Sequence, residues 1–237
     1  MKRFMLSILI LSLTVILTGC LYPDDRLVKN RTPYEEQLHS VQKAVQKYRM
    51  DTGVLPIENR DQGTPIYIKY PIDFGKLVPR YISEPPGNSY QTGGIFQYVL
   101  VDVEKEPKVK LVDLEAVEKV KDYRLSIRLY LEKNNYLPYK DVLANKRYTL
   151  KYKEIGYDKQ PVVKSPFTGN NLPLIVDEKN NVYIDYSMDL YHALQDKSHS
   201  YQNGDDIRDI LVRDSMFVPA FSVPYTVQDS EPVFLLK

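Results

Sequence analysis

The sequence predicts an α+β fold of two tandem units, each a helix packed on a small antiparallel sheet, with a C-terminal extension across both. Three observations predict it: two helix-spaced apolar faces, short strand-forming runs between turn signals, and self-similarity at one fixed spacing along the chain. The predicted units are residues 33–112 and 113–186, and the predicted extension is 187–237. Two further segments, 1–19 and 20–32, precede them.

Residues 1–19 have the pattern of a secretory signal peptide. Two basic residues precede the apolar run Phe4–Leu17, and the small residues Thr18 and Gly19 follow it. A membrane-spanning helix needs roughly 20 apolar residues. Extending the run through Leu21 brings it close to this length, so a short uncleaved membrane anchor is the alternative interpretation.

The four residues Leu17-Thr18-Gly19-Cys20 resemble the lipobox of bacterial lipoproteins. The resemblance implies that the Cys20 thiol receives a diacylglyceryl group, that a peptidase removes residues 1–19, and that the new amino terminus accepts an acyl chain such as palmitate. It implies a lipid anchor at the extracytoplasmic face of the cell membrane, because two acyl chains hold a protein there stably. Taken whole, the chain resembles uncharacterised lipoproteins of Bacillus-type bacteria, which implies the same location and no activity.

The composition limits the classes of partner. Cys20 is the only cysteine, so no disulfide can form within the chain. Removal of the signal peptide would remove Lys2 and Arg3, and the remaining chain would have 30 basic and 31 acidic residues. This balance argues against a nucleic-acid partner and against a polybasic membrane patch. The 20 tyrosines favour packing on half-buried strands over contact with sugars or peptides.

Residues 20–32 are polar and contain proline, which is typical of a tether between the lipid and the fold. Thr32, Pro33 and Glu35 form a capping-box pattern that predicts the start of a helix. The helix is expected to run to about Arg49. Its apolar face consists of four residues spaced 3, 4 and 3 apart, Leu38, Val41, Val45 and Tyr48.

Residues 38–88 align without a gap on residues 120–170, with identities at helix ends, turns and strand positions. The apolar face reappears as Val120, Tyr123, Ile127 and Tyr130. After one inserted residue, 98–102 lies on 181–185. This self-similarity predicts a duplicated structural unit. The alternative is two unrelated α+β stretches that use common stop signals.

Each unit is expected to have the same order of elements. The helices end at Gly53 and Asn135, which tolerate the left-handed conformation of a helix C-cap. A short strand follows at Ile66–Ile68 or Tyr148–Leu150, and then a turn at 85–88 or 165–171. Two strands close each unit, near 95–103 and 108–112 in the first, and at Leu172–Val176 and Val182–Tyr186 in the second.

The stretch from Tyr48 to Pro56 resembles the helix end of type II secretion pseudopilins, with a tyrosine, an Asp-x-Gly step and a proline. The second unit keeps Tyr130 and Pro138 but has Lys133 and Asn135 in place of Asp and Gly. The resemblance implies a fold like the globular head of a pilin. It does not imply polymerisation into a pilus, because the prepilin cleavage pattern is absent from the sequence.

The extension is expected to contain helices at Ser187–Gln195 and Asn203–Arg213, the second with Asp205 and Asp206 in its first turn. Apolar residues then alternate with prolines, a pattern of edge strands and extended contacts. We expect this segment to pack across both units. The alternative is an exposed edge that binds a peptide.

The sequence predicts no catalytic residues, no metal and no cofactor. Ser40 and Lys43 match S-x-x-K, but the accompanying motifs are absent and the helix face is explained by packing. His192, Asp196 and His199 have the spacing of zinc ligands on one helical face. The ordinary interpretation is three polar residues on a solvated surface, since Ser198 and its neighbours suggest that the helix ends before His199. The adjacent pairs Asp24-Asp25 and Asp205-Asp206 point apart and do not form an acid/base pair.

Three functional hypotheses follow. The first is a non-enzymatic interaction or assembly module of the cell envelope, tethered to the membrane, whose partner is an envelope protein or a wall polymer. The second is a receptor for a glycan or a small solute that uses tyrosines between the two units. The third is a metal-assisted enzyme of the envelope that depends on His192.

Overall fold

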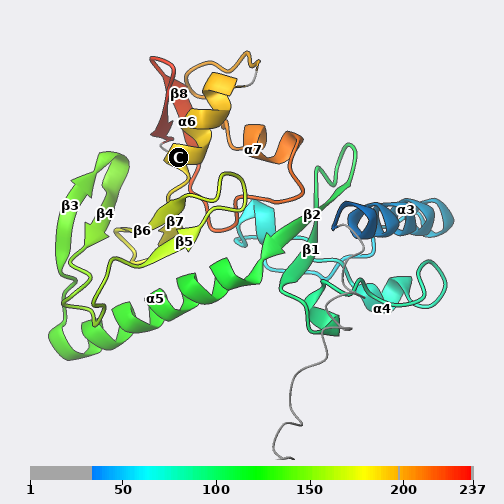
Figure 1. Ribbon diagram of the computed structural model, residues 1–237, viewed down its shortest axis with the longest axis horizontal. Helices are drawn as coiled ribbons and strands as arrows, with labels where there is room; N and C mark the ends of the chain where they lie inside the picture. The colour runs from blue at the N-terminus through cyan, green and yellow to red at the C-terminus, as the bar shows by residue number, and fades with distance from the viewer. Residues whose placement is uncertain (1–33, 197, 236–237) are drawn as a thin grey trace, which may run out of the picture. The chain divides into compact units, whose positions relative to one another are not determined.

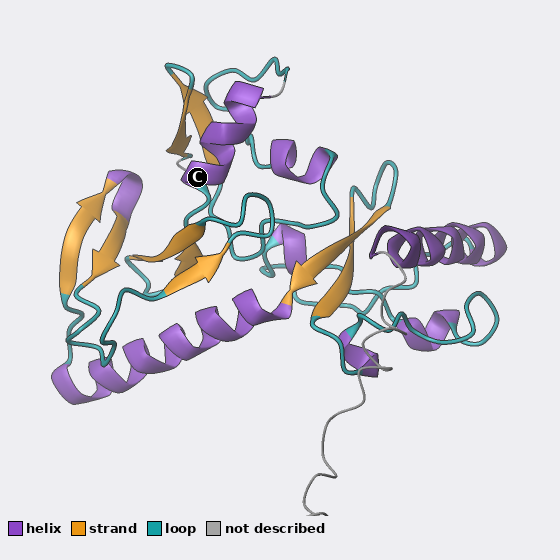
Figure 2. Cartoon of the chain, in the orientation of Figure 1, coloured by secondary structure: helices purple, strands orange, loops and turns teal. Residues whose placement is uncertain are grey.

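The computed structural model describes residues 34–196 and 198–235. It confirms the predicted α+β class, with helices beside small antiparallel sheets (Figures 1 and 2). The signal segment, Cys20, the tether and the start of the capping box lie outside the described residues. Among the residues that are described, no helix is both long and apolar enough to cross a membrane.

The first predicted unit begins with helix α3 (Tyr34–Thr52), which buries Val41, Ala44 and Val45. These side chains share a core with the hairpin of β1 (Phe96–Val101) and β2 (Lys108–Asp113). The helix continues to Thr52, slightly beyond the expected end at Arg49, and Gly53 follows it with a φ of +74°. Three short helical elements lie between α3 and β1: the 3-10 helix η2 (Ile66–Ile68), α4 (Phe74–Leu77) and the 3-10 helix η3 (Tyr90–Thr92).

The predicted strand at residues 66–68 is wrong, because Ile66–Ile68 forms the 3-10 helix η2. Pro65 precedes it with a φ of −53°, and the Ile68 amide donates to the Pro65 carbonyl. Tyr67 and Ile68 both pack against the same core. A strand would send adjacent side chains to opposite faces, so this packing requires a helical turn.

The second predicted unit begins with helix α5 (Leu114–Asn134), which leads from β2 to a five-stranded antiparallel sheet (Figure 1). Val120, Tyr123 and Ile127 of the predicted face are buried. The sheet has the order β3-β4-β6-β5, and β7 pairs with β6. Its strands are β3 (Tyr139–Leu143), β4 (Arg147–Leu150), β5 (Val162–Lys164), β6 (Asn171–Asp177) and β7 (Val182–Ile184), with the 3-10 helix η4 (Ala144–Lys146) between β3 and β4.

The ends of α3 and α5 have the same local geometry at equivalent positions of the internal alignment. The Gly53 amide donates to the Arg49 carbonyl at 2.8 Å, and the Asn135 amide donates to the Leu131 carbonyl at the same distance. The closing hairpins differ, however. The alignment places β1 on β7, but β1 pairs with the following strand, β2, whereas β7 pairs with the preceding strand, β6. Duplication of one unit therefore stays a prediction.

In the extension, α6 (Ser187–Asp196) matches the predicted helix, but α7 spans only Asp209–Arg213. The predicted start at Asn203 is wrong because the two aspartates expected in the first turn have other partners. A carboxylate oxygen of Asp205 accepts from the Gln202 amide, and Asp206 pairs with the Arg208 guanidinium at 2.6 Å. A final hairpin joins β8 (Tyr225–Gln228) and β9 (Glu231–Phe234).

The segment from Met216 to Ser222, which we call the connecting segment, pairs with strands of both units. The Leu111 amide of β2 donates to the Met216 carbonyl at 2.8 Å, and the Val218 amide donates back to the Leu111 carbonyl at 3.1 Å. The Ile184 amide of β7 donates to the Phe221 carbonyl at 3.0 Å. Parallel bridges at both strands accompany these bonds. The extension therefore packs across both units, as the sequence predicts.

A buried lysine adds a polar contact to the same junction. Lys110 of β2 is 8 % exposed, and its ammonium donates to the carbonyls of Val212, at 2.7 Å, and Ser215. Val212 lies in the last turn of α7. Helix carbonyls at this end lack intrahelical partners and carry partial negative charge, so a cation stabilises them.

We predict that Lys110→Met destabilises the protein by about 1–3 kcal/mol, because it removes the buried ammonium that donates to the carbonyl oxygens of Val212 and Ser215. Urea unfolding followed by circular dichroism measures the change. Lys108→Met is the matched control, since Lys108 lies on the same strand with an exposed side chain; it should change stability by less than about 0.5 kcal/mol. Equal unfolding midpoints for the two variants would contradict the assigned role of Lys110.

Candidate functional site

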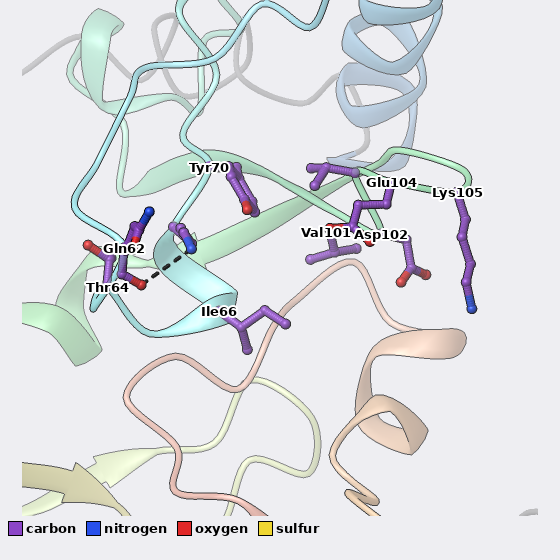
Figure 3. A pocket seen from close by; sticks show the side chains of 10 residues that line it. Gln62, Thr64, Ile66, Tyr70, Val101, Asp102, Glu104 and Lys105 are labelled. Atoms are coloured by element: carbon purple, nitrogen blue, oxygen red, sulfur yellow. Dashed lines mark hydrogen bonds between the residues drawn. The ribbon is translucent and has the colours of Figure 1, made fainter.

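A cavity of about 420 Å³ lies within the first predicted unit (Figure 3). The loop before η2, the residues of η2 and just after it, and the turn between β1 and β2 form its walls. The lining residues are Gln62, Thr64, Ile66, Lys69, Tyr70, Val101, Asp102, Val103, Glu104 and Lys105. We call it the first cavity.

The wall at residues 64–70 follows from the helical turn of η2. Since Tyr67 and Ile68 point into the core, Ile66 is left 57 % exposed at the cavity. The chain then runs beside β1, where the Leu100 amide donates to the Tyr70 carbonyl at 2.8 Å. This backbone pairing fixes Tyr70, whose half-buried ring lines the cavity.

The opposite wall is the β1–β2 turn, which begins at Asp102 with a φ of +51°. Aspartate tolerates this left-handed conformation better than most residues. The Lys105 amide donates to the Asp102 carbonyl at 3.1 Å and closes the turn. The turn thus places the side chains of Asp102, Glu104 and Lys105 beside the cavity (Figure 3).

The polar side chains of the first cavity are largely free of protein partners. The Lys69 ammonium donates to the Gln62 carbonyl at 3.3 Å and lies 5.6 Å from the centroid of the Tyr70 ring. Across the described part of the chain, the side chains of Gln62, Asp102 and Glu104 have no protein hydrogen-bond partner. Their donors and acceptors are available to a ligand.

A second cavity, of about 410 Å³, lies between α6, the turn at 166–168 and residues 211–217 of the extension, with Glu35 of α3 at its wall. Four carboxylates line it, those of Glu35, Asp189, Asp196 and Asp214, together with His192. The remaining lining is mostly apolar, and includes Phe167, Met216 and Phe217.

Asp189 is the most buried of these acids, and only 1 % of the residue is exposed. Ser165 donates its hydroxyl to one carboxylate oxygen at 2.7 Å, and Thr168 donates to the other at 2.6 Å. Burial raises the pKa of Asp189, and the two hydrogen bonds oppose this rise only in part. The carboxyl group ties the turn at 165–168 to α6. Sequence reasoning missed it, because no local pattern connects residues 165 and 189.

The structure separates the three residues that have zinc-ligand spacing. His192 and Asp196 line the second cavity, and α6 ends at Asp196. His199 instead stacks on Tyr201, with ring centroids 5.6 Å apart. Within residues 34–196 and 198–235, no group of three or more His, Cys, Asp or Glu side chains could hold a metal ion. Ser40 and Lys43 lie together on α3, beside Glu36 and His39.

Several tyrosines are buried in the core with their hydroxyl groups paired. Tyr98 donates to the Asn88 amide oxygen at 2.7 Å, Tyr186 to the Ala220 carbonyl at 3.1 Å, and Tyr225 to Asp185 at 2.8 Å. Burial raises the pKa of all three phenols. Where the two units meet, Val99 and Val112 pack into the core of the second unit. These tyrosines therefore serve packing, and the first cavity lies inside one unit.

We predict that the stability contributed by Asp189 depends on pH. The folded pKa is raised above the ordinary value of 3.8, so the folded state favours the protonated carboxyl. The contribution is complete below the unfolded pKa and is lost as pH rises through the folded pKa. Urea unfolding from about pH 3 to about pH 7 should show wild-type stability falling relative to Asp189→Asn.

Asp196→Asn is the control, because it removes an exposed carboxylate from the same helix. A difference between wild type and Asp189→Asn that stays constant over this pH range would contradict the assignment.

Comparison with known proteins finds one family match. A family model described as the YphF family N-terminal domain matches residues 34–113. The match runs from the start of α3 to the N-cap of α5 at Asp113, so it contains every residue of the first cavity. No curated protein and no solved structure matches the chain.

Proposed function

We propose that this chain is a lipid-anchored extracytoplasmic protein that serves as a non-enzymatic interaction or assembly module of the cell envelope. The observation that carries the proposal is the lipobox-like sequence Leu17–Cys20 at the end of a signal-like segment. The polar residues 20–32 follow it and lead to α3. A lipidated Cys20 would hold the compact body of residues 35–237 beside the membrane.

The structural roles of several buried and partly exposed polar groups support the non-enzymatic part of the proposal. Asp189 is held by two hydroxyls, and Asp185 accepts from the Tyr225 hydroxyl and the Ser187 amide. The Arg208 guanidinium is fixed by Asp206 and donates to the Ser222 carbonyl at 3.1 Å. Asp189, Asp185 and Arg208 each form a hydrogen bond between segments that are distant in sequence, so these groups stabilise the fold.

A receptor for a glycan or a small solute is the second candidate, and the first cavity favours it. The cavity has an aromatic wall, an exposed aliphatic side chain and free polar groups. This combination is typical of small-molecule sites. The two candidates are compatible, since a wall polymer is itself a glycan partner.

We predict that cells fed labelled palmitate incorporate it into the wild-type chain and not into Cys20→Ser, because the thiol is the acceptor. Labelling of the purified chain after gel electrophoresis measures the transfer. The control is Ser40→Cys in the Cys20→Ser background, which restores a thiol outside the lipobox and should remain unlabelled. Equal labelling of wild type and Cys20→Ser would contradict the anchor.

We also predict that cross-linking of intact cells joins the wild-type chain to one discrete envelope component. The cross-linked product should disappear in the Cys20→Ser variant, which lacks the anchor, because tethering to the membrane raises the local concentration of the two partners. Immunoblotting measures the shift in size. A chain that stays uncross-linked in growing and in sporulating cells would contradict the interaction role.

A further inference from the structure

We propose that the first cavity binds an uncharged saccharide unit. The proposal deepens the proposed function and rests on it, because it names the chemical class of the envelope partner. It is argued from seven residues: Gln62, Ile66, Lys69, Tyr70, Asp102, Glu104 and Lys105.

The size of the cavity suits a small ligand or one unit of a polymer. Its volume of about 420 Å³ is at the small end of the roughly 300–1,000 Å³ typical of ligand pockets. The loop at 62–64, the η2 segment and the β1–β2 turn supply residues from separate sides (Figure 3). A ligand inside would contact three segments of the chain at once.

The apolar part of the lining matches the C–H face of a sugar ring. The half-buried ring of Tyr70 and the 57 % exposed side chain of Ile66 both line the cavity. An aromatic ring provides a flat apolar surface together with a polar group at its edge. A pyranose has the same combination of C–H surface and hydroxyl groups.

The polar part of the lining offers both donors and acceptors. The Gln62 amide can donate and accept, while the carboxylates of Asp102 and Glu104 accept only. Lys69 and Lys105 supply ammonium donors at the two sides of the cavity. Because a sugar hydroxyl both donates and accepts, neighbouring hydroxyls can satisfy this mixed set.

The charge of the lining favours a neutral ligand. Two carboxylates, Asp102 and Glu104, are balanced by two ammonium groups, Lys69 and Lys105. The second cavity differs, because four carboxylates line it and neither lysine nor arginine does. A strongly charged ligand would therefore gain little net attraction in the first cavity.

The position of Tyr70 is set before any ligand arrives. The backbone of residues 70–72 pairs with β1 through two hydrogen bonds. The Leu100 amide donates to the Tyr70 carbonyl, and the Ile72 amide donates to the Tyr98 carbonyl. Asp102 begins the turn directly after β1. Both walls of the cavity are thus attached to one strand. Binding therefore costs little conformational entropy, because few segments have to become ordered around the ligand.

The test uses the full chain, purified in detergent from membranes, with four trisaccharide probes. Maltotriose and N,N′,N″-triacetylchitotriose are neutral, the glucosamine trimer is cationic, and trigalacturonic acid is anionic. Saturation-transfer NMR and titration calorimetry measure binding. We expect saturable binding of at least one neutral probe, at least tenfold tighter than that of either charged probe.

Two variants test whether the neutral probe binds in the first cavity. Tyr70→Ala should weaken binding of the neutral probe at least tenfold, and Gln62→Ala should weaken it at least threefold. Gln62 is exposed, so its substitution tests the site even when loss of Tyr70 affects folding, which circular dichroism reports. Tyr90→Ala is the control, because Tyr90 is 43 % exposed in the same unit and does not line the cavity.

The proposal is overturned by three results: no saturable binding of either neutral probe, tighter binding of a charged probe, or equal binding by wild type and Gln62→Ala. These failures are distinguishable from failure of the proposed function. Palmitate labelling and cross-linking in cells report on the anchored interaction module without any soluble saccharide. A labelled, cross-linked chain that binds none of the neutral probes would overturn the saccharide site alone.

Discussion

The fold depends on the pairing of the connecting segment, Met216–Ser222, with one strand of each unit. A two-stranded hairpin such as β1–β2 is marginally stable by itself in water. The segment adds backbone partners to β2 at Leu111, while residues 70–72 add partners on the outer side of β1. It then continues to β7 at Ile184. The hydrogen bonds of two small sheets are thus completed by a single stretch of chain.

This pairing also determines the geometry of the first cavity. β2 is held on one side by the connecting segment and on the other by β1, and β1 in turn holds the backbone of Tyr70. The β1–β2 turn, which carries Asp102 and Glu104, is fixed at the end of the same hairpin. The cavity is therefore far from the connecting segment along the chain but only two strands away from it in the sheet.

Local patterns predicted the elements whose geometry is decided by nearby residues. The apolar spacing around Val120 and Tyr123 predicted the buried face of α5, and Gly53 and Asn135 predicted the helix ends. The strands of the β1–β2 and β6–β7 hairpins were also predicted from their apolar runs and turns.

Tertiary contacts decided the elements that sequence patterns missed. The residues of η2 have strand propensity, but Tyr67 and Ile68 must face one core. The predicted first turn at Asp205 and Asp206 was wrong, because Asp206 pairs with Arg208, whose guanidinium also donates to the distant Ser222 carbonyl. The two cavities bring together residues that are distant in sequence, such as Gln62 and Glu104 in the first and Thr168 and Asp189 in the second. Such contacts leave no local signal, so composition and spacing could not predict either cavity.

Amide hydrogen exchange tests the role of the connecting segment most directly. The amides of Leu111, Val218 and Ile184 donate the hydrogen bonds that join this segment to the two strands. If the connecting segment joins the two sheets, all three amides exchange with one common free energy, equal to that of global unfolding, because the two sheets open together. Exchange of Leu111 and Ile184 with clearly different free energies would show that the two sheets open independently, and would contradict the account.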